Sequence, residues 1–127
     1  HHRHSYYIIR NAEMLGFTEN EKEIVANVAR YHRKSHPKLK HPDFAKLTAD
    51  EQLVIRKLAA ILRIADGLDR SHTSSISNID ISHSESRVTF SITGNAENIE
   101  LEIWGAESKK KLFEEVFGIE VEFKSTI

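Results

Sequence analysis

The chain has 127 residues, of which 39% are hydrophobic and 29% are charged, with no cysteine and a net charge of −1. This composition is typical of a folded globular chain, and it excludes a disordered tail, a disulfide framework and a thiolate metal site. No apolar run approaches the roughly 20 residues that span a bilayer, and no signal peptide opens the chain, so we expect a cytoplasmic protein without a membrane partner.

Charge is distributed unevenly along the chain. Residues 1–73 carry 13 Lys and Arg against 9 Asp and Glu, a net of +4, whereas residues 74–127 carry 5 against 10, a net of −5. No acidic residue occurs between Ile24 and Pro42. The cations of this acid-free stretch include Arg30, Arg33, Lys34 and Lys38. Such a block suits a polyanionic ligand, and the alternative is a solvated, Lys-rich loop.

Two helices are predicted at the start of the chain. Residues 5–15 place apolar side chains at a spacing of three to four, and Gly16 ends the pattern. A second helix opens at Thr18, where Glu21 three residues later completes a capping box. Its expected inward stripe is Ile24, Val25, Val28, Ala29 and His32.

The segment from residue 35 to 47 contains two prolines and no clean period, so it is predicted to be a loop. Thr48 and Glu51 form a second capping box, which opens a long helix to about residue 68. The expected inward side chains of this helix are Val54, Leu58, Ile61, Leu62 and Ala65.

After residue 75 the apolar period changes to two, which is typical of strands. The pattern predicts strands at 76–82, 87–93 and 98–104, a helix at 106–117 and a last strand at 119–123. The expected fold is therefore of the α+β class. A helical domain over residues 1–73 precedes a small β-β-β-α-β domain over residues 74–127.

Three metal-capable side chains fall on the predicted core stripes, each near a helix end: His4, His32 and Asp66. Imidazole nitrogen and carboxylate oxygen together suit Zn, Mn or Fe, and facing helices commonly assemble such sites. Three ligands leave open positions for water or phosphate, as metal-assisted hydrolysis requires. The alternative is that each is an ordinary core residue with a local hydrogen-bond partner.

Arg63 and Arg70 lie close to Asp66 on the same predicted helix. They are candidates for orienting a phosphate, and the alternative is that they cap the helix end. The glycines are scattered, so the chain has no glycine-rich phosphate loop.

Three segments resemble the C-terminal region of the Ppx/GppA family of exopolyphosphatases and guanosine pentaphosphate phosphatases. They are His-His-Arg-His-Ser-Tyr-Tyr-Ile-Ile at 1–9, Ala-Arg-Tyr-His-Arg-Lys-Ser-His-Pro at 29–37, and Leu-Ala-Ala-Ile-Leu-Arg-Ile-Ala-Asp-Gly-Leu-Asp-Arg-Ser-His at 58–72. The resemblance covers about residues 1–72, and residues 73–127 fit the small α/β domain that ends many family members.

The helical part of that region is similar to the metal-dependent HD phosphohydrolases. The resemblance matches Asp66 to their final metal-binding Asp, and His4 and His32 to additional His ligands. The defining His-Asp pair would lie upstream of residue 1. The implied cofactor is a divalent ion, Mg, Mn, Zn or Fe.

The resemblance implies an accessory role, because the family's phosphatase chemistry belongs to actin-like N-terminal domains that this chain does not contain. We expect the chain to bind inorganic polyphosphate or guanosine pentaphosphate, to contact those N-terminal domains, and to support homodimerisation or regulation. The alternative is an HD-type metal-dependent phosphohydrolase domain. RNA binding is a weaker third reading, because no strand platform presents paired exposed aromatic residues.

Overall fold

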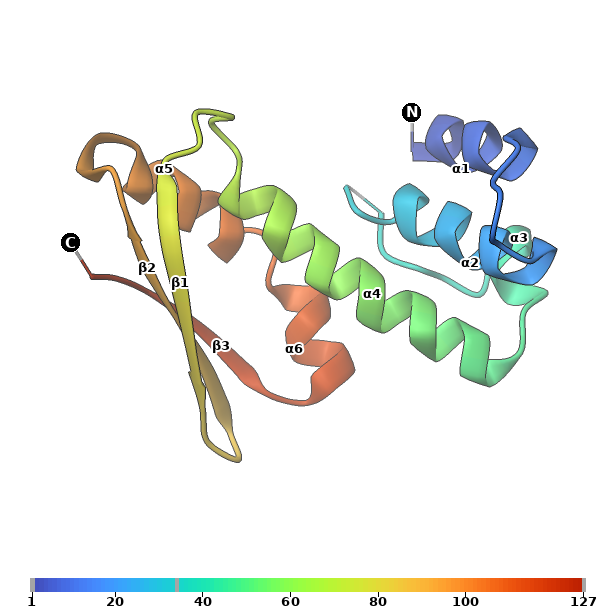
Figure 1. The fold of residues 1–127 in the computed structure, drawn as a ribbon. Helices are drawn as coiled ribbons and strands as arrows, with labels where there is room; N and C mark the ends of the chain where they lie inside the picture. The colour runs from blue at the N-terminus through green and yellow to red at the C-terminus, as the bar shows by residue number, and fades with distance from the viewer. Residues whose placement is uncertain (1, 34, 127) are drawn as a thin grey trace. The chain divides into compact units, whose positions relative to one another are not determined.

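The structure is a computed structural model that describes residues 2–33 and 35–126 (Figure 1). The chain divides into two compact units, His1–Ala59 and Ala60–Ile127. The division falls inside a long helix, whereas the predicted domain boundary lies near residue 73, where the sheet begins. Helices precede a three-stranded sheet, which confirms the predicted α+β class. None of the helices in the described ranges is long and apolar enough to span a bilayer.

The first unit is helical, and both predicted capping boxes form. The Thr18 hydroxyl accepts from the Glu21 amide while the Glu21 carboxylate accepts from the Thr18 amide, and Thr48 and Glu51 repeat this arrangement. A short helix interrupts the segment predicted to be a loop, with a proline in its first turn. The helices are α1 (His2–Asn11), α2 (Glu19–Arg30), α3 (Pro42–Ala45) and α4 (Ala49–Leu68).

The predicted inward stripes of α2 and α4 were wrong. On α2 the buried side chains are Glu23, Ala26, Asn27 and Arg30, and the apolar stripe predicted to face inward is only partly buried. The reason is that cations from neighbouring segments pair with Glu23. On α4 the five predicted residues are exposed, whereas the buried face includes Ile55, Ala59, Ala60, Ile64 and Leu68. Both faces of α4 are apolar, so the helical period alone did not select between them.

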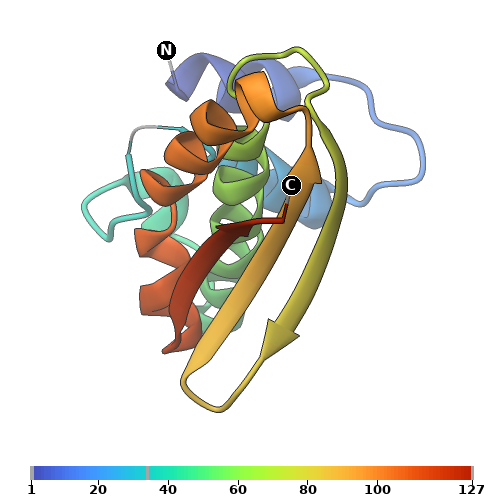
Figure 2. The same ribbon diagram turned by 90° about the vertical axis from the view of Figure 1, so that its left-hand side faces the viewer.

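The second unit is built on a sheet of order β1-β2-β3, drawn yellow to red in Figure 2. β1 pairs antiparallel with β2, and β2 pairs parallel with β3. One face of the sheet is apolar and packs with Ile64 and Leu68 of α4 and with Ile99 and Ala106. The strands are β1 (Ile76–His83), β2 (Arg87–Gly94) and β3 (Glu120–Ser125).

The strand predicted at 98–104 was wrong, because this segment belongs to helix α5 (Ala96–Glu107). The Asn95 side chain caps the helix by accepting from the Glu97 amide. Ile99, Ile103 and Ala106 then lie on one helical face and pack against the sheet. The helix predicted at 106–117 is shorter, α6 (Lys111–Phe117), so the observed order is β-β-α-α-β rather than β-β-β-α-β.

Candidate anion-binding site

A buried cation without an ionic partner lies in the last turn of α2. Arg30 is 3% exposed, and its Nε atom has no hydrogen-bond partner. Among the residues that the structure describes, no carboxylate forms an ion pair with Arg30. The Arg30 guanidinium lies over the Tyr31 ring, 5.1 Å from its centroid. A buried guanidinium nitrogen without an acceptor is costly, so the Nε atom of Arg30 makes this residue a candidate for contact with an anion.

Tyr31 connects Arg30 to the segment that follows α2. Its hydroxyl is 2.6 Å from His41 Nδ1, and the two rings stack with centroids 5.6 Å apart. Burial raises the pKa of the Tyr31 phenol, the positive charge of Arg30 lowers it, the carboxylate of Asp43 raises it and, more weakly, the charge of Arg3 lowers it. Arg3 on α1 therefore adds positive potential near Tyr31, and the negative charge of Asp43 opposes it.

The neighbouring buried carboxylate, Glu23, already has partners. Its oxygens lie 2.7 Å from Arg10 Nε and 2.9 Å from Lys46 Nζ, and it accepts a hydrogen bond of 2.6 Å from the Tyr6 hydroxyl. Burial and this hydrogen bond raise the pKa of Tyr6. Arg10 and Lys46 are the cations that pair with Glu23. Glu23 therefore does not serve as the counter-ion of Arg30.

The other predicted phosphate-binding residues of the acid-free stretch lie at the surface. Arg33 and Lys38 are exposed, and Lys34 lies outside the described residues. Long exposed cations can follow a flexible polyanion, whereas a buried guanidinium fixes one phosphate in place. Burial thus distinguishes Arg30 from Arg33 and Lys38.

Arg63 and Arg70 belong to the second unit, where they have different surroundings. Arg63 is buried on α4, and this burial lowers the pKa of its guanidinium while the charge of Asp66 opposes the effect. Arg70 is exposed and lies over the Trp104 ring, 4.8 Å from its centroid. Their role in phosphate binding stays a prediction.

The predicted metal ligands are divided between the units. His4 is exposed on α1 rather than on a buried stripe, and His32 and Asp66 are partly buried. His32 Nδ1 donates to the Ala29 carbonyl, so Nε2 is the atom left to ligate a metal. Considered separately, neither unit gathers three His, Asp or Glu side chains around one point among its described residues. The donor types suit a divalent ion, and the metal site stays a prediction.

Sequence reasoning did not single out Arg3. The available signal was its position beside His4 in the first of the three family-like segments, but a lone cation on an exposed helix face carries no signature of its own. Its contribution depends on the packing of α1 against α2, which the sequence pattern does not specify.

Comparison with known proteins agrees with the resemblance seen in the sequence. A family described as Ppx/GppA phosphatase, domain III, matches residues 1–110. The chain is also 37% identical over 65 residues to a guanosine-5'-triphosphate,3'-diphosphate pyrophosphatase of Pseudoalteromonas translucida (strain TAC 125). That stretch is 51% of this chain but only 12% of the relative. The chain belongs to the Ppx/GppA phosphatase family, and its matched region corresponds to domain III.

Proposed function

We propose that this chain is an accessory module of a Ppx/GppA phosphatase that binds a phosphate polyanion at the end of α2. Arg30 is the buried anchor, and Arg3, Arg33 and Lys38 extend the contact over the surface. The ligand is inorganic polyphosphate or guanosine pentaphosphate. The observation that carries the proposal is the Arg30 guanidinium, which is 3% exposed and has an unpartnered Nε atom.

A phosphate oxygen would satisfy what Arg30 lacks. The planar guanidinium presents donors in a fixed fork that matches a phosphate, and such charge-assisted bonds are stronger than neutral ones. No acidic residue occurs from 24 to 42 in the sequence, which favours a positive potential at the end of α2, although the Asp43 carboxylate acts against it at Tyr31. The Pseudoalteromonas relative is a pyrophosphatase named for guanosine-5'-triphosphate,3'-diphosphate, which supports a ligand of this class.

Hydrolysis takes place outside this module. In this view the actin-like N-terminal domains carry the phosphatase chemistry, and this module retains the chain of phosphates and supports dimerisation or regulation.

The test measures polyphosphate binding by this chain over a range of salt concentrations. We expect Arg30→Met, which keeps the length of the side chain, to weaken binding about tenfold at low salt. The slope of log affinity against log salt should fall by about one, because one phosphate contact is lost. Lys57→Met is the matched control, since Lys57 is exposed on α4 outside the acid-free stretch.

Thermal unfolding of the same variants separates binding from folding. Removal of a buried, unpaired charge should leave the unfolding midpoint unchanged or higher. Absence of polyphosphate binding by the unmodified chain at low salt would contradict the proposal. So would equal loss of affinity in Arg30→Met and Lys57→Met, because the contact would then be diffuse rather than anchored.

A further inference from the structure

Two buried polar atoms without partners lie one turn apart on α2. Asn27 is fully buried, and its Oδ1 atom has no hydrogen-bond partner among the described residues. The same holds for the Nε atom of Arg30, three residues later. Residues three apart on a helix are neighbours on one face, with Cβ atoms about 5 to 6 Å apart. The structure therefore places an acceptor that lacks a donor beside a donor that lacks an acceptor.

The orientation of the Asn27 amide is fixed by its nitrogen atom. Nδ2 donates to the backbone carbonyl oxygens of Glu23 and Asp43, at 3.0 and 3.3 Å. Only the amide nitrogen can donate to both carbonyls, so the amide cannot turn over without losing both bonds. Oδ1 therefore stays available to a donor, and a ligand that binds at this place has to supply one.

An ionised phosphate oxygen meets only half of this requirement. It accepts from Arg30 Nε, but it is an acceptor itself and gives nothing to Asn27 Oδ1. A phosphate in the middle of a linear chain carries no proton near neutral pH. A terminal phosphate loses its last proton only at about pH 6, as a phosphoserine does. At that pH the P–OH group of a chain end can donate to Asn27 while another oxygen of the same phosphate accepts from Arg30.

The burial of the two atoms favours a chain end for a steric reason as well. A phosphate in the middle of a chain would have to bring both flanking phosphates into a covered place, whereas a terminal phosphate needs a smaller opening. A protonated terminus also carries less charge, which lowers the cost of its desolvation. The exposed cations Arg33 and Lys38 can then contact the rest of the chain at the surface.

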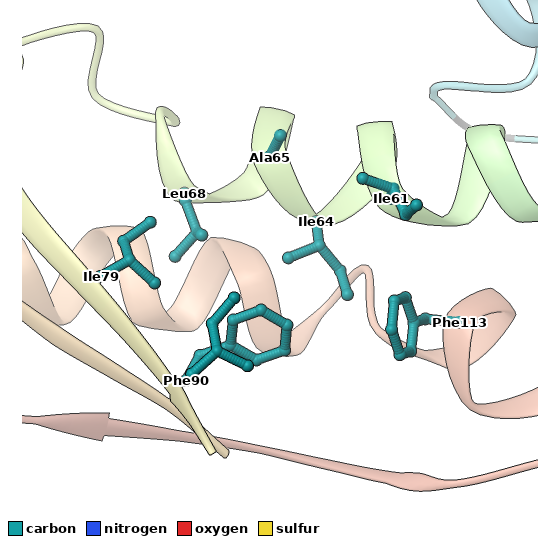
Figure 3. A pocket seen from close by; sticks show the side chains of 8 residues that line it. Ile61, Ile64, Ala65, Leu68, Ile79, Phe90 and Phe113 are labelled. Carbon is teal, nitrogen blue, oxygen red and sulfur yellow. The ribbon is translucent and has the colours of Figure 1, made fainter. Parts of the chain in front are cut away.

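The pocket of the second unit, about 240 Å³ between α4, the sheet and α6, offers no such contacts (Figure 3). The side chains that line it, among them Ile64, Phe90 and Phe113, are all apolar. Without a donor or an acceptor, they cannot compensate the desolvation of a phosphate. Of these two places, the end of α2 is the one that can take a phosphate group.

We propose that Asn27 and Arg30 together bind the protonated terminal phosphate of a phosphate chain, and that Asn27 selects this group against anions that carry no proton. The inference rests on the proposed anion site and specifies which part of the ligand enters it. Inorganic polyphosphate and guanosine pentaphosphate both end in such a group.

The first test compares orthophosphate with sulfate on the unmodified chain at about pH 6 and equal ionic strength. Sulfate is fully ionised there and carries more charge, so a general attraction to cations favours sulfate. Orthophosphate keeps a proton that it can donate to Asn27. We expect orthophosphate to shift the Arg30 Nε–H signal in proton–nitrogen correlation spectra at concentrations at least about tenfold lower than sulfate. Arg30→Met assigns this signal by removing it.

The second test compares linear tripolyphosphate with cyclic trimetaphosphate, which has as many phosphates but no chain end. The linear form should bind at least about tenfold more tightly. Asn27→Leu, a side chain of similar shape, should reduce this ratio to the smaller one that charge alone gives. Asn11→Leu is the matched control, because Asn11 Nδ2 also donates to the carbonyl four residues earlier but is exposed. Guanosine triphosphate presents a chain end on a nucleoside, and it should compete with tripolyphosphate.

Three outcomes on the unmodified chain would overturn the inference, whether or not Asn27→Leu folds. They are a sulfate as effective as orthophosphate, a cyclic ligand bound as tightly as the linear one, and a nucleotide that does not compete. If these occur while binding still depends on Arg30, the proposed anion site is retained, and a water molecule bridges Asn27 and Arg30 instead. If no phosphate binds, or if Arg30→Met leaves binding unchanged, the proposed anion site itself is wrong.

Discussion

The two units of this chain bury polar side chains in different ways. In the second unit the fully buried Glu102 accepts hydrogen bonds of 2.9 Å from the Ser71 amide and 3.1 Å from the Ser71 hydroxyl. In the first unit Glu23 is neutralised by cations, whereas Arg30, about two turns further along the same helix, forms no ion pair with a carboxylate of the described residues. Buried polar groups are normally satisfied, and the two buried carboxylates meet this requirement differently, Glu102 through hydrogen bonds from Ser71 and Glu23 through neighbouring cations.

The units also differ in what holds their helices together. The second unit relies on an apolar sheet core and on a close approach of α4 and α5 at Gly67 and Gly105. The first unit adds an ionic cluster, with Glu23 at its centre, to buried residues such as Tyr31, Phe44 and Ile55. Substitutions that affect shape should therefore be most damaging in the second unit, and substitutions that affect charge in the first.

Gly67→Ala should give the largest loss of stability. A methyl group at Gly67 would lie 2.6 Å from the Gly105 carbonyl oxygen, and a backbone atom cannot move away as a side-chain end can. We expect the free energy of unfolding in urea to fall by about 3 kcal/mol. In an open helix the same change would raise it by about 1 kcal/mol, since alanine is the better helix former. A stabilised variant would show that α4 and α5 do not approach closely.

Glu23→Gln should have the next largest effect. The amide removes the charge that Arg10 and Lys46 neutralise, and it leaves the Tyr6 hydroxyl with a weaker acceptor. We expect urea unfolding to show a loss of about 2 kcal/mol. Glu13→Gln is the control, because Glu13 is exposed in the connection that follows α1. If both variants lose the same unfolding free energy, the ionic cluster around Glu23 does not stabilise the first unit.

Local signals were sufficient for those elements whose ends are specified by neighbouring residues. Thr18 and Thr48 each lie three residues before a glutamate, and both helices begin at these caps. The first two strands were predicted because their alternation is bounded by a short turn, Ser84 to Ser86, that joins them into a hairpin. In these cases the deciding contacts lie within a few residues, so a single sequence contains them.

The failures and the site both depend on distant contacts. The acid-free stretch indicated Arg30 as a candidate, but its burial is a tertiary property, at a helix end where Tyr31 contacts His41 ten residues later. Glu102 is a polar member of the alternating run that predicted a strand, yet it is fully buried, and its partner Ser71 lies 31 residues earlier in the chain. Period and composition cannot predict such partners, because they carry no information on which distant segments meet.

Asn95→Ala tests the most informative of these failures and should have the smallest effect of the three. The Asn95 side chain accepts from the Glu97 amide and opens α5, in a segment whose alternating Ile99 and Ile103 also fit a strand. Loss of this cap should cost about 1 kcal/mol of unfolding free energy, and Asn95→Asp should restore most of it, since aspartate caps equally well. A strand would not need a cap, so no effect of Asn95→Ala in urea unfolding would contradict the helix. If Asn95→Ala lowers the unfolding free energy and Asn95→Asp restores it, the Asn95 cap outweighs the period-two pattern of this segment. The cap and the buried Glu102 together then favour a helix here, which gives the second unit its β-β-α-α-β order.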